Sequence, residues 1–195
     1  KSGADVIVVD GMQGGTGATQ ECFIEHVGIP TLPAVRMAAE ALKELGMHRE
    51  GVQLIVSGGI RSGADVAKAI ALGADAVSIG TAALIALGDN NPDLEEEYNK
   101  LGTTAGFYDE WQAGDDPAGI TTQDEKLAAR LDPKKGGEKL ANYLKVLTLE
   151  AQTLARACGK SHIRNLEPED LNALTLEASA MAKVPLAGTD WIPGK

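Results

Sequence analysis

Three short segments of the chain are almost continuously apolar, and a glycine-rich turn follows each of them. The apolar segments span residues 4–10, 52–56 and 76–79. The turns begin at Gly11, Gly58 and Gly80. Apolar runs without polar alternation are typical of parallel strands that are covered on both faces. The pattern predicts three strands of a parallel sheet, with the first strand, at 4–10, covered on both faces.

Segments between and after these strands have apolar residues at helical spacing. The predicted helices span residues 30–45, 64–72, 94–101, 127–131, 138–158 and 165–182, and a further helix opens at Gly80-Thr81. Gly46, Gly73 and Gly159 stand where the helices before them should end. Strands that alternate with helices predict an α/β fold.

The chain changes character after Gly88. Residues 102–124 form a long loop rich in Gly, Asp and Thr, and loops of that length are usually functional when they are ordered. Aromatic residues make up only 4% of the chain, so the cluster of Phe107, Tyr108 and Trp111 indicates that this loop packs against something. We divide the chain into βα units at 1–88, this loop region at 89–137 and a helical C-terminal extension at 138–195.

Three strands are too few for a parallel sheet that must be covered on both faces and closed or paired at its edges. A TIM barrel has eight strands. The chain begins with Lys1 and enters a strand almost at once. We interpret it as a fragment, the C-terminal part of a (β/α)8 TIM barrel that contains the last three strands, with the other strands in a longer chain or a partner.

The turns at Ser57-Gly58-Gly59 and Gly80-Thr81 are candidates for a phosphate site. Each follows a predicted parallel strand and precedes a helix, so backbone N–H groups and helix N-termini meet at one edge of the sheet, where they favour an anion. In TIM barrels the turns after the last two strands often bind phosphate. The alternative is that these glycines serve only tight turns.

The first strand leads into Gly11–Thr19, which has four glycines in its first seven residues. Glycine lets a backbone approach a ligand closely, and ordering such a loop requires a bound or packed partner. We interpret it as an active-site loop, with a flexible connection as the alternative. Asp10, at the end of the strand, is a candidate catalytic residue or a structural acceptor for loop N–H groups.

Charge and composition narrow the classes of partner. The 28 Asp and Glu residues outnumber 18 scattered Lys and Arg residues, which argues against a nucleic-acid partner. The sequence contains neither an apolar run of membrane-spanning length nor a leader-like start, so we expect no membrane partner and a cytoplasmic location. Cys22 and Cys158 have no metal-ligand spacing, so we expect no metal site and predict that both are small buried residues.

Together these motifs resemble the FMN-binding synthase domain of glutamate synthases. The resemblance rests on Gly11–Ala18, on Gly58–Val66, on the Gly-Thr-Ala-Ala-Leu-Ile-Ala-Leu-Gly run at 80–88, and on Gly-Ile-Thr-Thr-Gln-Asp at 119–124. It covers roughly the first two thirds of the chain. The first and third motifs together are specific, whereas the Gly58-Gly59 unit occurs in many phosphate-binding barrels.

The resemblance implies FMN as the cofactor. It implies that Ser57, Gly58, Gly59, Gly80 and Thr81 bind the flavin, mainly its phosphate, and that Lys1 lies near the isoalloxazine. The loop from Asp10 to Thr16 would face flavin and substrate, with candidate catalytic residues Asp10, Gln13, Gly14, Gly15 and Thr16. The implied reaction is reductive amination of 2-oxoglutarate to glutamate through 2-iminoglutarate. Amidotransferase-like or reductase subunits and an oligomeric state are implied as well.

The sequence departs from this family at one point. Family members hold a three-iron cluster with three cysteines, separated by five and then four residues, just before the Gly-Ile-Thr-Thr-Gln segment. This chain has Ala105, Trp111 and Asp116 at those positions. Iron–sulfur clusters depend on thiolate ligands, so we expect no iron–sulfur cluster in this segment.

Three other functions stay open. The flavin subunit of N-methylglutamate synthase uses the same barrel on methylamine and glutamate, and the missing cysteines fit that subunit. An IMP dehydrogenase-like barrel also has a Gly-Gly-Ile-Arg turn, although Cys22 lies beyond the loop where its nucleophile should be. A scaffold subunit that kept the barrel without its electron chemistry is the alternative outside enzymes.

Overall fold

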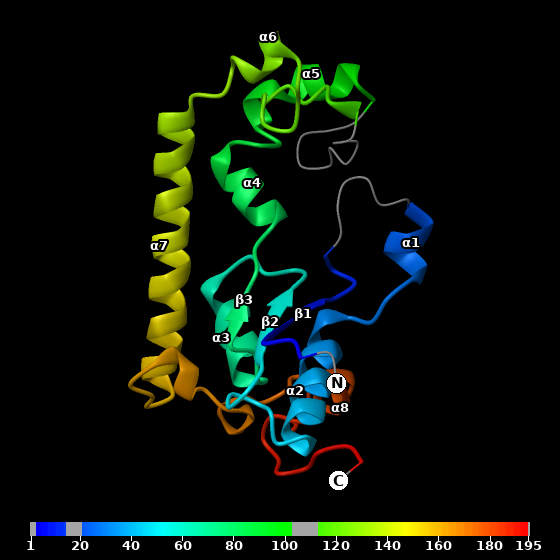
Figure 1. The fold of residues 1–195 in the computed structure, drawn as a ribbon, viewed down its shortest axis with the longest axis vertical. Helices are drawn as coiled ribbons and strands as arrows, with labels where there is room; N and C mark the ends of the chain where they lie inside the picture. The colour runs from blue at the N-terminus through cyan, green and yellow to red at the C-terminus, as the bar shows by residue number, and fades with distance from the viewer. Residues whose placement is uncertain (1–2, 15–20, 103–112, 195) are drawn as a thin grey trace.

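The computed structural model describes residues 3–14, 21–102 and 113–194 (Figure 1). Its centre is a parallel sheet in the order β1-β2-β3, formed by β1 (Val6–Asp10), β2 (Gln53–Ser57) and β3 (Ala76–Val77). The crossover helices are α2 (Thr31–Glu44) and α3 (Gly63–Ala71), while α1 (Glu21–His26) lies to one side in Figure 1. The predicted α/β fold is confirmed, and its parallel βα units are compatible with part of a TIM barrel.

The core lies between the sheet and the helices that cover it. Leu54 and Val56 of β2 are fully buried, because these alternate residues lie on one face of the sheet and pack in the core with residues of the covering helices. The other main core residues are Val35, Ala39, Ile70, Leu72, Leu147, Ala151 and Ala155. α3 begins with a capping box in which the Ser62 hydroxyl and the Asp65 carboxylate each accept a backbone N–H.

β1 differs from the prediction that both of its faces are covered. Val6, Ile7 and Val8 are 43%, 40% and 59% exposed. β1 is an edge strand: in the described part of the chain it pairs only with β2, and α2 packs against it. A continuous apolar run indicates that both faces of a strand are suited to burial. The run does not show which part of a protein covers those faces.

After β3 the chain leaves the sheet and then returns along it. The outgoing elements are α4 (Thr81–Leu87), η1 (Pro92–Leu94), α5 (Glu95–Lys100) and α6 (Glu125–Ala128). The long α7 (Pro133–Ala157) then runs beside α4 and α3 (Figure 1). α7 begins before the predicted Glu138, because Pro133 at its first position and the Asp132 side chain, which accepts two N–H groups, start the helix early.

The predicted helix at 165–182 is wrong before residue 176. The structure has short 3₁₀ turns η3 (Ile163–Asn165) and η4 (Pro168–Asp170), followed by α8 (Leu176–Ala182). The backbone of Ala173 pairs instead with the tail, accepting from Ala187 N–H and donating to Pro185 C=O, both at 2.8 Å. These long-range hydrogen bonds hold residue 173 extended, and the Thr175 side chain starts α8 afterwards.

Cys22 and Cys158 are both exposed, which contradicts the prediction that they are buried. Cys22 lies on the short α1, and Cys158 is the C-cap residue of α7, three residues after the buried Ala155. Within residues 3–14, 21–102 and 113–194, no helix combines the length and the apolar character needed to cross a bilayer.

Candidate functional site

The turns that follow the three strands leave the same edge of the sheet. The register pairs Asp10 with Ser57 and Val56 with Val77, so the carboxyl ends of the strands lie level. Ser78 N–H donates to Val56 C=O at 2.8 Å, so the hydrogen bonding between β2 and the chain after β3 continues to within two residues of Gly80. The turns at Gly58 and Gly80 therefore start side by side, as a shared phosphate site requires.

The loop after β1 packs backbone to backbone against the turn after β2. Gly11 N–H donates to Ser57 C=O at 3.0 Å. Gly58 has a φ of +104°, and a Cβ there would lie 2.9 Å from Gly11 O. A side chain at Gly58 is therefore excluded both by its backbone conformation and by the neighbouring loop.

Thr31, which the sequence analysis missed, joins the two loops. Its N–H and hydroxyl lie 2.7 and 2.8 Å from Gln13 Oε1, and the hydroxyl lies 3.0 Å from Gly58 O. Pro30 provides no side-chain cap for α2, so Gln13 caps the helix from another loop. Because a backbone N–H can only donate, the oxygen of Gln13 faces Thr31 and its NH₂ group points away from it.

Asp10, Gln13 and Gly14 are brought together at this edge. Gly14 N–H donates to Gly11 C=O at 2.8 Å, and a Cβ on Gly14 would run into the Asp10 carboxylate. Gly59 lies against Gln13, whose Cβ would be 3.1 Å from a Cβ at position 59. The other predicted residues of this group, Lys1, Gly15 and Thr16, lie outside the described residues.

The turn amides have hydrogen-bonding capacity to spare. In the described part of the chain, the N–H groups of Gly59, Gly80 and Thr81 donate to no protein acceptor. Gly80 is exposed, and a Cβ there would meet nothing within 4 Å. An anion could therefore reach these donors from solvent without displacing protein atoms.

The N-terminus of α3 is different, because carboxylates of the protein already occupy it. Gly63 N–H donates to Glu150 Oε2 of α7 at 2.7 Å. The N–H groups of Arg61 and Ser62 donate to Asp65 Oδ2 at 3.0 and 3.1 Å. We had expected helix N-termini to contribute to the anion site, but at α3 the available donors are those of the preceding turn.

A second polar cluster lies beyond α4, where the family pattern has cysteines. Asp116 is fully buried, and its carboxylate accepts from the Tyr98 hydroxyl at 3.1 Å. It also accepts from the N–H groups of Ala118, Ile120 and Thr121 at 2.8–3.0 Å. Asp116 therefore holds the loop that leads into the Gly-Ile-Thr-Thr-Gln segment.

Ala105, Phe107, Tyr108 and Trp111 lie outside the described residues. Among the residues that the structure describes, no three His, Cys, Asp or Glu side chains are grouped to hold a metal ion.

Asp89 belongs to the same cluster and is only 2% exposed. Its Oδ1 accepts from Asn90 N–H at 2.9 Å, whereas its Oδ2 has no hydrogen-bond partner among the residues that the structure describes. Burial, and secondly the charge of Asp116, raise the pKa of Asp89 to about 6. The native state therefore favours the protonated carboxyl, and its stability falls as pH rises from the ordinary aspartate pKa towards 6.

We expect Asp89→Asn to stabilise the protein at pH 8 and to have little effect near pH 4. The amide keeps an acceptor for Asn90 N–H but removes the buried charge, which should raise the free energy of unfolding by about 3 kcal/mol at pH 8. Urea unfolding of both proteins at the two pH values measures this difference. An equal gain at pH 4 would mean that ionisation of Asp89 is not the cause.

Comparison with known proteins identifies the family to which these loops belong. The model described as the conserved region in glutamate synthase matches residues 1–91 and 112–161. The gap between these matched segments, 92–111, contains two of the three positions where the family pattern has cysteine. The matched part contains all of the turns described above.

Individual relatives carry the same name. A glutamate synthase large subunit-like protein of Rhizobium meliloti (strain 1021) is 73% identical over 195 residues, which are 100% of this chain and 44% of that protein. An archaeal glutamate synthase [NADPH] of Methanocaldococcus jannaschii is 43% identical over 165 residues, covering 85% of this chain and 29% of that protein. The chain thus spans less than half the length of these curated relatives. On the family match and these identities, the chain belongs to the glutamate synthase family.

Proposed function

We propose that this chain is the C-terminal part of an FMN-dependent glutamate synthase barrel and contributes its last three strands. The reaction is reductive amination of 2-oxoglutarate to glutamate through 2-iminoglutarate. The observation that carries the proposal is the convergence of three glycine turns at one sheet edge, in a chain whose relatives are named glutamate synthases. The division into βα units at 1–88, a loop region at 89–137 and a helical extension at 138–195 belongs to the same proposal.

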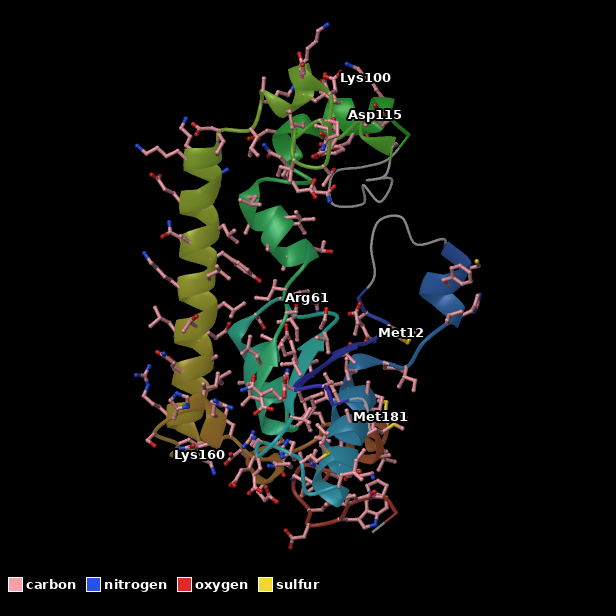
Figure 2. All side chains as sticks on the ribbon, viewed as in Figure 1. Met12, Arg61, Lys100, Asp115, Lys160 and Met181 are labelled. Carbon is pink, nitrogen blue, oxygen red and sulfur yellow. The ribbon has the colours of Figure 1, made fainter. Side chains whose placement is uncertain are left out.

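The residues at this edge fit the phosphate of FMN. Gly59, Gly80 and Thr81 offer N–H groups that have no acceptor in the described part of the chain. Gly58 has a positive φ, which turns the backbone between Ser57 and Gly59. Figure 2 shows Arg61 at the end of the sheet that faces α4, so a cation lies in the same turn. Bound FMN would supply the hydride for the imine carbon. Lys1 is assigned to the isoalloxazine end of the cofactor.

The loop after β1 is assigned to the substrate. Thr31 holds the Gln13 oxygen, which leaves the Gln13 NH₂ group to donate to a carboxylate or carbonyl oxygen of 2-oxoglutarate. Asp10 lies beside Gly14 at the carboxyl end of β1, where its side chain can accept a hydrogen bond from the bound nitrogen group and orient it. Gly15 and Thr16, which lie outside the described residues, are assigned to the substrate on the family resemblance.

The exposed side of β1 supports the barrel interpretation. Val6, Ile7 and Val8 are apolar and at least 40% exposed, on an edge strand whose outer side pairs with nothing within the described ranges. Soluble proteins normally cover such an edge. The other strands of the barrel would pair with this edge. Amidotransferase-like or reductase subunits, and an oligomeric assembly, are part of the same proposal for the whole protein.

A second candidate is the flavin subunit of N-methylglutamate synthase. Asp116 favours it, because a buried carboxylate with four hydrogen bonds stands where the family pattern has a cluster cysteine. Such a subunit would keep the flavin site and act on methylamine and glutamate. The IMP dehydrogenase-like alternative gains no support from the comparisons, because the matched family is glutamate synthase.

A single-turnover assay of the full-length protein tests the function. The flavoprotein is reduced anaerobically and mixed with 2-oxoglutarate and ammonium, and the products are identified by mass spectrometry. Glutamate formed together with flavin reoxidation is the expected result. A parallel sample with methylamine and glutamate reports N-methylglutamate if the second candidate is right. A colourless protein that takes up no FMN would instead identify a scaffold and contradict both.

A further inference from the structure

The turn at residues 58–62 is held from two directions. On one side, Arg61 N–H donates to Asp65 of the adjoining α3 at 3.0 Å. On the other side, Arg61 C=O accepts from the Tyr143 hydroxyl of α7 at 2.7 Å. Asp65 belongs to the same βα unit, but Tyr143 comes from the C-terminal extension, 82 residues later.

α7 is fixed closely against the start of α3. A Cβ on Gly63 would lie 2.6 Å from both Ala151 N and Glu150 Cβ, so the two helices are in backbone contact there. Glu150 strengthens this contact through its hydrogen bond to Gly63 N–H at 2.7 Å. The position of Tyr143, two turns earlier on the same helix, is therefore set by backbone packing rather than by its own hydrogen bond.

The same helix also reaches the βα unit that carries the second turn. A Cβ on Gly136 would lie 3.5 Å from Leu87 O, at the end of α4, and α4 begins directly after Gly80. α7 runs beside both α3 and α4 (Figure 1). One straight helix thus contacts both units whose turns must converge on a shared phosphate.

We propose that Tyr143 is a positioning residue for the phosphate turn: its hydroxyl fixes the Arg61 carbonyl, so that the Gly59 N–H points towards the turn at Gly80. This inference rests on the proposed FMN site. It adds that a residue of the C-terminal extension helps to shape that site. Burial and, secondly, the negative charge of Asp65 raise the pKa of Tyr143, so the hydroxyl stays a donor throughout the neutral range. Without it, the Arg61 carbonyl loses this hydrogen bond, and this end of the turn is held through the Arg61 and Ser62 N–H groups, which donate to Asp65.

Tyr143→Phe in the full-length protein tests the inference. Titrations of the apoprotein give the Kd for FMN and for riboflavin, which lacks the phosphate, and thermal unfolding of the apoprotein is measured alongside. We expect the Kd for FMN to rise about 5-fold, as for the loss of one hydrogen bond, with the Kd for riboflavin unchanged. Thr148→Val is the matched control, because its hydroxyl donates only to Leu144 C=O within α7.

The outcomes separate this inference from the proposed function. If the wild type binds FMN and Tyr143→Phe binds it equally well, Tyr143 does not position the turn, although the FMN site stands. Equal weakening of FMN and riboflavin would show general loosening of the protein and would also overturn the role of Tyr143. A wild-type protein that binds no FMN would remove both the proposed function and this inference.

Discussion

Gly80→Asp is expected to weaken FMN binding by the full-length protein by at least 100-fold. The position is exposed and a Cβ there meets nothing within 4 Å, so the new side chain costs no packing. Its carboxylate would stand in the turn assigned to the phosphate. Two like charges about 5 Å apart repel by about 3 kcal/mol at an effective dielectric constant of about 20, which corresponds to on the order of 100-fold in affinity. Fluorescence titration of the apoprotein with FMN measures the change.

Gly51→Asp is the matched control for this substitution. A Cβ on Gly51 also meets nothing within 4 Å, but Gly51 precedes β2 and so lies at the opposite edge of the sheet. This variant has the same change in net charge and should bind FMN like the wild type. Equal affinity of the two variants for FMN would show that Gly80 is not at the phosphate. The structure makes Gly80 a cleaner test than Gly58, where a side chain would also meet Thr31 and Gly11.

Gly63→Ala is expected to lower the free energy of unfolding by about 3 kcal/mol, the upper part of the range for overpacked cores. The added methyl group would lie 2.6 Å from Ala151 N, and it would also run into Leu147 O. Both atoms belong to the backbone of α7 and cannot move aside as a flexible side chain can. Urea unfolding of the full-length protein measures the loss.

The control for Gly63→Ala is the same substitution at Gly137, where the added methyl group has free space. A Cβ on Gly137 meets nothing within 4 Å, and the residue lies in the first turns of α7. Alanine there should be neutral or stabilise by up to about 1 kcal/mol, because it favours helix more than glycine does. A Gly63→Ala protein as stable as the wild type would mean that α7 does not pack on α3 as described.

The spacing of apolar residues and glycines was enough to predict the central strand and the helix before it. The apolar run at 52–56 and the helix at 30–45 appear as β2 and α2. In both, the spacing of apolar residues along the sequence matches the side of the element that is buried. Since parallel strands end at one edge, the common edge of the Gly58 and Gly80 turns also followed from sequence. The predicted start of α7, at Glu138, is five residues too late, because the Asp132 side chain and Pro133 begin the helix and the chain continues through Gly136 and Gly137 in helical conformation.

Other features depend on long-range contacts that no local pattern contains. Thr31 joins Gln13 to Gly58 across 18 and 27 residues, so its role at the site could not be read from its neighbours. Ala173 is drawn out of a helical pattern by pairing with the tail. The Tyr143 contact with Arg61 joins the C-terminal extension to the turn at residues 58–62, although the sequence suggested that they were separate regions.

The ratio of the affinities of the wild-type apoprotein for FMN and for riboflavin tests the central claim most directly, namely that the turns at Gly58 and Gly80 hold the FMN phosphate. The two ligands share the isoalloxazine and differ in the phosphate, so their ratio isolates the contribution of that group. We predict that FMN binds at least about 100-fold more tightly and that Gly80→Asp removes most of this preference. Equal affinities for FMN and riboflavin in the wild type would contradict the assignment of these turns to the phosphate.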